Sequence, residues 1–433
     1  MESVWMRGIK APAFETLKWD IKTDVLIIGG GLAGILCADA LRCAGVNYVL
    51  VEADKICSGI TKNTTAKITL GHGLIYDKML RRFGEEKTRL YYQAQSKAID
   101  KYRKMCENIN CDFEEKVNYV YSLDDREKLE REAAALRRVG CDATVVSELP
   151  LPFNTQGAVK VNGQAQFDPL KFAYEVAKDL NIFENTKVLE LTDGGALTNH
   201  GRITAEKIIV ATHFPFINKH GSYFLKMYQH RSYVLALSGA PDVDGMYVDE
   251  AKKGLSFRSY KGLLLLGGGS HRTGKQGGNW AELEEFARRH YPNASQVCRW
   301  ATQDCMTLDG IPYIGRYSSR TRELYAVTGF NKWGMTSSMV AASILCDLVR
   351  GKENKYSEVF SPSRSILRPQ LAVNAFESAV NLLTPTAPRC PHLGCALKYN
   401  KAEHSWDCPC HGSRFTEKGE LIDNPATDDK RIP

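Results

Sequence analysis

Short apolar runs alternate with amphipathic segments along most of the chain, a pattern that predicts strands and helices in turn. The run 24–28 is a predicted strand, the apolar-periodic segment 35–43 a predicted helix, and 48–51 a second predicted strand. Strands that are apolar throughout are typical of a parallel sheet covered by helices. The N-terminal part of the chain is therefore expected to form a βαβ unit within an α/β fold.

Later segments continue the alternation and add exposed helices. Residues 207–212 predict a strand, and a helix-period apolar stretch runs from Thr336 to about Leu348. The segment 127–138 is rich in Lys, Glu and Arg, whose charges suit an exposed helix face with i,i+4 pairs. The apolar runs 232–237 and 263–266 predict strands of a second sheet.

The composition is that of a globular protein with two or three domains, because 433 residues can bury several cores. The net charge of +7 is spread along the chain, and no block of like charges indicates nucleic-acid binding. Residues 1–22 lack an apolar run long enough for a secretory signal, and no run elsewhere could span a membrane. Nine of the 13 cysteines are scattered without framework spacing, which favours a reducing, cytoplasmic location.

A glycine-rich turn follows the first predicted strand. Gly29-Gly-Gly31-Leu-Ala-Gly34 has the spacing G-x-G-x-x-G, and Glu52 ends the second strand about twenty residues on. Gly29 allows the tight turn, Gly31 lets the backbone approach a pyrophosphate, and Gly34 lets the helix pack against the strand. In this context the spacing indicates a Rossmann-type dinucleotide site. FAD and NAD share this fingerprint, and a turn without a ligand is the other alternative.

A second glycine-rich run, Gly267-Gly-Gly269-Ser-His-Arg272, follows the apolar run 263–266. Arg272 stands where the fingerprint needs Gly or Ala, and neither a good helix nor a distal acid follows. The chain therefore carries one good dinucleotide fingerprint. This disfavours an NADH-dependent ferredoxin reductase, which would carry two.

The C-terminal segment contains Cys390-Pro-His392-Leu-Gly-Cys395 and then Cys408-Pro-Cys410-His411-Gly-Ser413. Each stretch combines Cys and His at metal-ligand spacing and adds one further Cys. An iron–sulfur cluster with two thiolates on one iron and two imidazoles on the other would use such a set. Tetrahedral zinc also accepts two Cys and two His, although zinc fingers usually group Cys with Cys and His with His. A loop held by disulfides alone is the third interpretation.

This segment resembles the Rieske proteins of the cytochrome bc type. The resemblance implies a [2Fe-2S] cluster with Cys390 and Cys408 on one iron and His392 and His411 on the other. It also implies a disulfide between Cys395 and Cys410.

Two features depart from the Rieske pattern. Few residues precede Cys390, so the strands of the usual base sheet are missing. We expect either that the rest of the chain supports the cluster loops or that the domain is minimal and fragile. Phe415 stands where high-potential centres carry a Tyr that hydrogen-bonds a ligand sulfur, whereas Ser413, the other such donor, is kept. Fewer hydrogen bonds to sulfur lower the potential, so we expect a potential below the bc-type range.

Most of residues 20–360 resembles the FAD-dependent oxidoreductases of the D-amino-acid oxidase and glycine oxidase superfamily. The resemblance rests on the glycine-rich turn, the hydroxyl-rich segment 57–67, and the stretches 309–315 and 325–336 in this order. It implies FAD at these positions: Gly29, Gly31, Leu32, Ala33, Gly34, Glu52, Ala53, Ser58, Gly59, Thr61, Thr65, Ala66, Val188, Ala211, Thr212, Gly310, Gly334, Met335 and Thr336.

Within this set, Glu52 is expected to bind the adenosine ribose and Val188 to lie against the adenine. Thr61 is expected along the pyrophosphate and ribityl chain, and the segment 65–67 beside the isoalloxazine. The helix that begins at Gly334 is expected to point its positive end at the flavin's pyrimidine oxygens, where reduced flavin carries charge.

The superfamily has a discontinuous FAD domain interleaved with an α+β substrate domain, and the chain is divided on that basis. The expected parts are an FAD domain at 20–85, 155–215 and 300–362, a substrate domain at 86–154 and 216–299, a connecting helix at 363–383 and a β-rich Rieske segment at 384–433.

A flavin and a one-electron cluster on one chain predict a dehydrogenase rather than an oxidase, because oxidases of the superfamily pass electrons to oxygen without a cluster. We expect oxidation of a small amine, amino acid or hydroxy acid, with an external electron carrier as a possible partner. The alternatives are a reductase fed by the cluster, which would reduce an unsaturated or imine substrate, and a redox carrier or sensor without a substrate. Lys332, directly before the Trp333-Gly334 turn, is the candidate catalytic residue, as a cation near the flavin.

Residues that could bind a substrate carboxylate lie beside the predicted strands of the second sheet. A packing role is the commoner interpretation for any one of them, although the fork of an Arg suits a carboxylate. These candidates are His230, Arg231, Tyr233, Arg258, Tyr260, His271 and Arg272.

Overall fold

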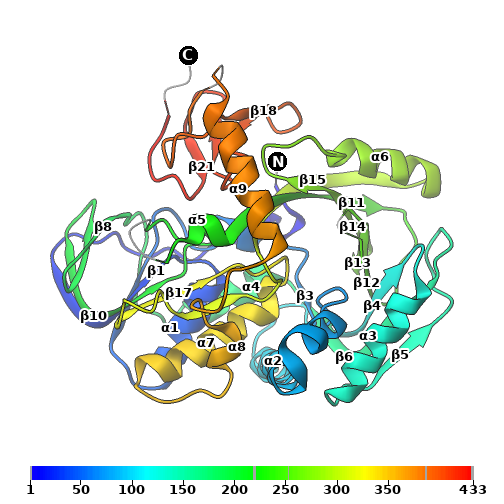
Figure 1. Cartoon of the computed structure of the whole chain (residues 1–433), viewed down its shortest axis with the longest axis horizontal. Coiled ribbons are helices and arrows are strands. Elements are labelled where there is room, and N and C mark those ends of the chain that lie inside the picture. The colour runs from blue at the N-terminus through cyan, green and yellow to red at the C-terminus, as the bar shows by residue number, and fades with distance from the viewer. Residues whose placement is uncertain (1, 218–220, 252, 386–387, 431–433) are drawn as a thin grey trace.

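The computed structural model describes residues 2–217, 221–251, 253–385 and 388–430. Within these ranges the strands form three sheets, two large and one small (Figure 1). The expected mixed α/β fold with a β-rich C-terminal segment is confirmed. In the described part of the chain, no helix is long and apolar enough to cross a membrane.

The helices of the described residues include the four predicted at 35–43, 127–138, 336–348 and 363–383, and five that were not predicted individually. They are α1 (Leu32–Cys43), α2 (Tyr76–Cys106), α3 (Arg126–Arg138), α4 (Pro169–Ala177), α5 (Tyr223–Lys226), α6 (Asn279–His290), α7 (Gly334–Val349), α8 (Ser357–Phe360) and α9 (Pro369–Leu383), with 3-10 turns η1 (Val4–Met6) and η2 (Ile60–Asn63). Helix α2 is kinked at Gly84, whose φ of 78° few other residues adopt without strain.

The first sheet carries the dinucleotide-type βαβ unit. Its order is β16-β17-β10-β1-β2-β7, with β8 and β9 attached to β10 as a hairpin. β1 pairs in parallel with both β10 and β2, and α1 packs against α7 beside them. The bounds are β1 (Ile21–Ile28), β2 (Tyr48–Val51), β7 (Ile182–Phe183), β8 (Val188–Thr192), β9 (Gly195–Thr198), β10 (Arg202–Val210), β16 (Tyr313–Arg316) and β17 (Leu324–Thr328).

The second sheet is larger and mostly antiparallel. Its order is β15-β11-β14-β13-β12-β4-β6-β3, and β5 pairs with β6. The predicted strands 232–237 and 263–266 lie inside β11 and β14. The bounds are β3 (Lys67–Ile68), β4 (Glu114–Ser122), β5 (Ala143–Val146), β6 (Gly157–Gln166), β11 (Met227–Ser238), β12 (Met246–Asp249), β13 (Ser256–Tyr260), β14 (Leu263–Arg272) and β15 (Ser295–Thr307).

The second sheet differs from the sequence expectation in two respects. The run Gly267–Gly269 is part of strand β14, which extends six residues beyond the predicted strand 263–266. Strands β6 and β15 belong to this sheet, although the predicted boundaries near 155 and 300 assign most of their residues to the FAD domain. The apolar pattern of a strand predicts its conformation but does not reveal which sheet it joins.

The C-terminal segment forms a small antiparallel sheet after helix α9, which lies within the connecting helix expected at 363–383. The strands are β18 (Lys398–Asn400), β19 (Ser405–Asp407), β20 (Arg414–Thr416) and β21 (Leu421–Asp423), in this order. Figure 1 shows this sheet at one end of α9, above the strands β11 and β15. The predicted end of the segment at 433 lies outside the described residues.

Candidate functional site: a dinucleotide cavity beside a Cys–His cluster

The glycine-rich turn has no room for side chains at two positions. A Cβ atom on Gly29 would lie 2.6 Å from the carbonyl oxygen of Ala211, and one on Gly34 would lie 1.9 Å from the carbonyl oxygen of Gly29. The Leu32 N–H donates to Oγ1 of Thr61 at 3.0 Å. Helix α1 thus begins three residues earlier than the apolar periodicity predicts, so its first turn is held at the strand ends.

Glu52 lies beside this turn, at the end of β2. Its carboxylate accepts hydrogen bonds from the N–H groups of Gly30 at 2.7 Å and Asp54 at 3.0 Å. Burial raises the pKa of Glu52, and these two bonds oppose the rise. Glu52 therefore stabilises the turn itself, in addition to the ribose contact that the sequence predicts.

A cavity of about 920 Å³ extends from this turn to the second sheet. This volume lies in the range of cofactor sites. The predicted residues that line it are Gly29, Gly31, Leu32, Ala33, Glu52, Ala53, Ser58, Gly59, Thr61, Thr65, Val188, Ala211, Thr212, Lys332, Gly334 and Met335. The structure thus brings sixteen separately predicted positions to one cavity.

Four other predicted FAD positions do not line the cavity. Gly34 packs against the backbone of Gly29, and Ala66 accepts a hydrogen bond through its carbonyl from Arg258 at 3.0 Å. The Gly310 N–H donates to Oγ1 of Thr307, and the hydroxyl of Thr336 donates to the carbonyl of Thr69 at 3.2 Å. These residues shape the cavity wall from behind it.

The second sheet closes the cavity opposite the glycine-rich turn. Tyr228, His230 and Ser232 on β11 line it, together with Ser270 on β14 and Asp304 on β15. His230 and Asp304 are cross-strand partners, so their side chains share a face of the sheet. Ser232, Ser270 and Asp304 were not singled out from the sequence; only Ser232 lies in a predicted strand, so no sequence signal was available for the other two.

Lys332 joins this group from the loop before α7. Its side chain is exposed to the cavity and not to the outer surface of the protein. Its Nζ donates to the hydroxyl of Ser270 at 3.1 Å. Desolvation lowers the pKa of Lys332, and the Asp304 carboxylate opposes this. Burial raises the pKa of Asp304 to about 6, although Lys332 and Arg231 oppose the rise. A cation and an acid therefore lie together in one cavity.

Lys67 is a second cation in the cavity wall. Burial, with a smaller contribution from Arg258, lowers the pKa of Lys67 to about 7. Arg258 is fully buried and donates to the carbonyls of Thr65 and Ala66 at 2.7 and 3.0 Å. Arg258 is thus a support for the predicted isoalloxazine loop and does not line the cavity.

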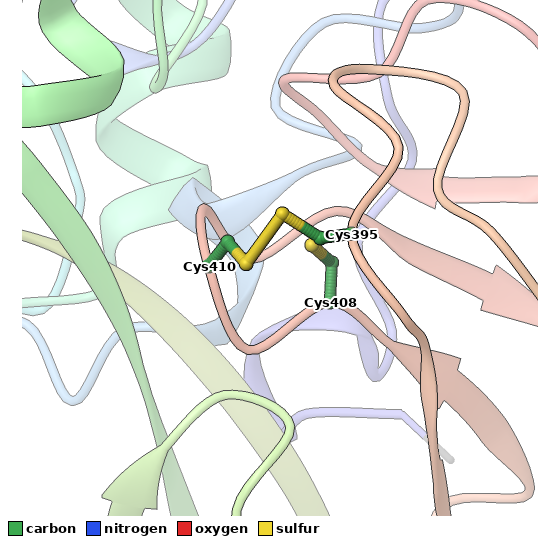
Figure 2. Close-up of side chains that lie close together, drawn as sticks. All are labelled: Cys395, Cys408 and Cys410. Atoms are coloured by element: carbon green, nitrogen blue, oxygen red, sulfur yellow. A yellow bond between two sulfur atoms is a disulfide. The ribbon is translucent and has the colours of Figure 1, made fainter. Parts of the chain in front are cut away.

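The C-terminal loops hold the predicted sulfur ligands and the predicted disulfide. Cys395 and Cys410 are bonded, and Figure 2 shows Cys408 directly beside this disulfide. The three sulfur atoms lie within 4.8 Å of one another. Because the disulfide engages two of them, Cys408 is left to pair with Cys390, whose side chain contacts those of Cys408 and Ser413.

The two predicted histidine ligands lie next to each other. The ring centroids of His392 and His411 are 4.9 Å apart, and the rings are nearly perpendicular. Nδ1 of His411 is buried and has no hydrogen-bond partner among the described residues. The two thiols contact each other, the two rings contact each other in the same pair of loops, and a buried ring nitrogen is left over, which fits a site with two thiolate and two imidazole ligands.

The same segment covers the other end of the dinucleotide cavity. Nδ2 of Asn424 donates to the carbonyls of Thr212 and Phe214 at 2.6 and 2.7 Å, and the Lys187 ammonium donates to the carbonyl of Thr427. Asn424 and Thr427 also line the cavity near Val188, where the sequence predicts the adenine.

Comparison with known proteins decides between the metal sites that the sequence left open. The FAD-dependent oxidoreductase family (DAO) matches residues 24–348, and the Rieske [2Fe-2S] domain matches residues 372–432. This chain belongs to the FAD-dependent oxidoreductase family. It carries a Rieske [2Fe-2S] domain at its C-terminal end, and its cofactors are FAD and the [2Fe-2S] cluster.

Individual relatives agree with this assignment. YhfW of Bacillus subtilis strain 168, named as a Rieske 2Fe-2S iron-sulfur protein, is 34% identical over 98% of this chain and 96% of its own length. Glycine oxidase from Geobacillus kaustophilus has the same fold, with a TM-score of 0.66 at 20% identity over 79% of this chain and 99% of that one. L-proline dehydrogenase from P. horikoshii has a TM-score of 0.67 at 18% identity, over 80% and 98%.

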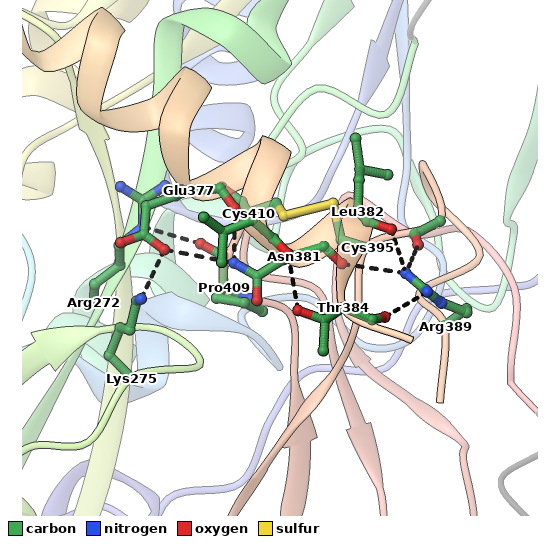
Figure 3. Close-up of a disulfide and its surroundings, with 12 residues drawn as sticks. Arg272, Lys275, Glu377, Asn381, Leu382, Thr384, Arg389, Cys395, Pro409 and Cys410 are labelled. Atoms are coloured by element: carbon green, nitrogen blue, oxygen red, sulfur yellow. Dashed lines mark hydrogen bonds and ion pairs between the residues drawn. A yellow bond between two sulfur atoms is a disulfide. The ribbon is translucent and has the colours of Figure 1, made fainter. Parts of the chain in front are cut away.

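The Rieske domain of the oxidoreductase rests on the second sheet through its cluster loops. Nε2 of Gln229 donates to the carbonyl of His411, and Nε2 of Gln303 to that of Gly412, both at 2.8 Å. Arg272 donates to the carbonyls of Pro409 and Cys410 at 3.0 and 3.2 Å (Figure 3). The flavoprotein body thus takes the place of the base strands that the short domain lacks.

A buried ion network fixes the same interface. Arg231 on β11 forms a two-bond pair with Glu403, and Arg414 contacts Glu403 at 2.8 Å, Asp407 at 2.9 Å and Asp423 at 3.0 Å. The side chains of Arg231, Glu403 and Arg414 are at most 7% exposed. In this structure Arg231 therefore binds the Rieske domain, and the packing interpretation holds for this substrate candidate.

Other substrate candidates have structural partners as well. The hydroxyl of Tyr233 contacts Glu403 at 2.9 Å and Nε2 of His271 at 3.0 Å. The hydroxyl of Tyr260 donates to Asp112 at 2.8 Å and Asp168 at 3.1 Å. Of the seven candidates, His230 and Tyr233 line the cavity.

Replacing Arg231 by Met should destabilise the docked Rieske domain by roughly 3–5 kcal/mol, because it leaves the Glu403 carboxylate buried with one partner fewer. Thermal unfolding and limited proteolysis of the holoenzyme measure this. Lys87→Met is the matched control, since it breaks the exposed pair with Glu358 and should cost about 0–1 kcal/mol. Equal losses in the two variants would contradict the role of the buried network.

The network should also make stability depend on pH. Burial alone would raise the pKa of Glu403, but Arg231 and Arg414 outweigh it and lower the pKa to about 2. The unfolded chain has a glutamate pKa of about 4.3. The stabilisation is therefore present above pH about 4.3 and is lost as the pH falls toward 2. The unfolding midpoints of wild type and Glu403→Gln should become more similar as the pH is lowered from about 4.3 toward 2. A difference that stays constant over this pH range would contradict the prediction.

Phe415→Tyr should raise the cluster potential by about 40–60 mV, because one new hydrogen bond to sulfur contributes roughly 1 kcal/mol. Phe415 is fully buried in the small core that contains Cys390 and Cys408. Phe360→Tyr, at another fully buried ring, should leave the potential unchanged. An EPR-monitored redox titration measures all three proteins. A wild-type potential near +300 mV, the upper end for Rieske centres, would contradict the expectation.

Proposed function

We propose that this oxidoreductase is a dehydrogenase that oxidises a small amine, amino acid or hydroxy acid and passes the electrons from FAD to its own Rieske cluster. Among these classes, the charges in the cavity favour an α-amino acid. Proteins of the same fold are named glycine oxidase, L-proline dehydrogenase and L-amino acid deaminase, which supports this substrate class.

The observation that carries the proposal is the alternation of contacts along β11. Tyr228, His230 and Ser232 line the cavity, the intervening Gln229 and Arg231 bind the Rieske domain, and Tyr233 does both. Successive residues of a strand point to opposite faces. One sheet layer therefore separates the cavity from the cluster loops. Stacked sheets pack about 10 Å apart, so a flavin in the cavity and a cluster in these loops would be neighbours across β11.

The cavity offers both charges that a zwitterionic substrate would need. Lys332 would bind the substrate carboxylate, and Asp304 would accept a hydrogen bond from the ammonium group. An acid whose pKa is raised to about 6 can also take a proton from that ammonium near neutral pH. FAD would then accept two electrons as a hydride, and the cluster would carry them away singly.

The test is anaerobic mixing of the purified holoenzyme with a panel of small amines, amino acids and hydroxy acids. Flavin bleaching followed by a Rieske-type EPR signal is the expected result. Bleaching without reduction of the cluster would contradict electron transfer to it. Flavin oxidation by an imine or unsaturated compound, after reduction of the cluster by dithionite, would favour a reductase. No response to any substrate in either direction would favour a redox carrier.

Replacing Lys332 by Met should slow flavin reduction by the substrate, with a higher KM, because the variant loses the cation beside Ser270. A loss of about tenfold or more is expected for one charged contact. Stopped-flow absorbance measures the rate, and Lys332→Arg should keep part of it. Lys355→Met, at an exposed position paired with Gln93, is the control. Unchanged flavin reduction and reoxidation in Lys332→Met would remove Lys332 from the site.

A further inference from the structure

Helix α9 is amphipathic in the reverse sense to a helix on a globular protein. Its buried residues are Asn374 and Asn381, whereas Phe376 is 68% and Leu383 82% exposed. A surface helix normally turns its apolar face inward and its polar face to water. The orientation of α9 therefore requires an explanation.

Polar contacts hold the inner face of α9 to the cluster loops and to β14. Oδ1 of Asn374 accepts from Arg272 at 2.9 Å, and Glu377 pairs with Lys275 at 2.7 Å (Figure 3). The carbonyl of Asn381 accepts from the Ala396 N–H at 2.9 Å. Arg389 caps the end of the helix through the carbonyls of Asn381, Leu382 and Thr384. These bonds fix which face of α9 points outward.

The outward face is apolar and uncharged along its whole length, about 22 Å. Glu377 is the one charged residue in 369–383, and it points inward with 17% of its side chain exposed. Exposed apolar side chains concentrate here: of thirteen large ones among the described residues, seven lie between 367 and 393. These seven are Leu367 (78%), Val373 (48%), Phe376 (68%), Val380 (44%), Leu382 (47%), Leu383 (82%) and Leu393 (40%).

Such a concentration marks an interaction surface, because scattered exposed apolar residues are normal and contiguous ones are not. Leu393 extends the surface onto the first cluster loop, beside the predicted ligand His392. Arg389 donates to the carbonyls of both Leu382 and Gly394, at 3.0 and 3.1 Å, so the end of the helix and the loop lie together.

Arginines without acidic partners stand at both ends of this surface. Arg82 and Arg368 lie over the same Phe83 ring, at 5.6 and 5.8 Å from its centroid, at the N-terminal end of α9. Arg389 lies at the other end and donates to carbonyl oxygens. In the described part of the chain, none of these three guanidinium groups has a carboxylate oxygen within 4.0 Å. Arg82 is exposed, so its charge can meet an anionic surface, whereas Arg368 and Arg389 are half-buried and the Asp309 carboxylate acts on the charges of Arg82 and Arg368 from a greater distance.

We propose that the outer face of α9, with Leu393 and the three arginines, docks the protein on an anionic lipid bilayer surface. An apolar helix face flanked by basic residues lies in the plane of a membrane interface, with its apolar side chains among the acyl chains. Anionic headgroups complement Arg82, Arg368 and Arg389. No other segment covers α9 in Figure 1, and lipid accommodates an apolar helix face without a preformed groove.

This docking would bring the cluster loop with His392 to the bilayer surface. It goes beyond the proposed function and does not depend on it, since the substrate cavity and α9 use different residues.

The test is co-sedimentation of the full holoenzyme with phosphatidylcholine vesicles, with and without phosphatidylglycerol. The wild-type protein should pellet with the anionic vesicles, and added salt should weaken this. Phe376→Ser combined with Val380→Ser should reduce the affinity at least tenfold. Arg82→Gln combined with Arg368→Gln should reduce the preference for anionic vesicles. Leu123→Ser combined with Leu189→Ser, at positions 51% and 52% exposed, should bind as wild type.

Three results would overturn the proposal: no pelleting of wild type with anionic vesicles, equal binding to both vesicle types, or equal loss in the Leu123/Leu189 control. A second copy of the chain is the competing occupant of this face, and sedimentation velocity tests for it by measuring the oligomeric state. A wild-type dimer that becomes a monomer in the Phe376→Ser variant would assign the face to a second copy and overturn docking on lipid. Flavin absorbance and the EPR signal report that each variant keeps its cofactors.

Discussion

The placement of the Rieske domain depends on one buried electrostatic contact, in which the carboxylate of Glu403 is shared by Arg231 and Arg414. Two guanidinium groups and the acids around them are removed from water, and such groups stabilise a structure only when every charge finds its partner. Arg231 belongs to β11 and Arg414 to β20, so the contact joins the second sheet to the domain with a single geometry. The neighbouring bonds of Gln229 and Gln303 to the cluster loop follow from that geometry.

The small domain and the large one are thus parts of one architecture. Four short strands cannot bury much apolar surface, and their core contains Cys390, Cys395, Cys408, Cys410 and Phe415 with few other side chains. The disulfide and the flavoprotein body supply what the missing strands would have supplied. The bonds of Gln229, Arg231, Arg272 and Gln303 hold the Rieske domain against the second sheet.

The sequence predicted the local features well because each has a short-range cause. The glycine spacing of the turn, the Cys–His spacing of each cluster loop and the apolar period of α9 are each set by residues a few positions apart in the chain. Long-range features were not predictable: Ser270 and Asp304 meet Lys332 through pairings of strands far apart in the chain. Arg231 and Tyr233 have the composition of a substrate site, yet their acid is Glu403, some 170 residues away. The alternation of residues along a strand predicts which face of the sheet a side chain is on, but it does not predict which part of the chain packs against that face.

The tail of the Rieske domain lies across the adenosine end of the dinucleotide cavity, where Asn424 binds the backbone of Thr212 and Phe214 and Thr427 binds Lys187. Residues of the C-terminal segment therefore form part of the wall of a cavity whose glycine-rich turn lies near the other end of the chain. The binding surface of the cavity is completed by two parts of the sequence about 400 residues apart, so the cluster domain and the dinucleotide-type fold share one structural unit.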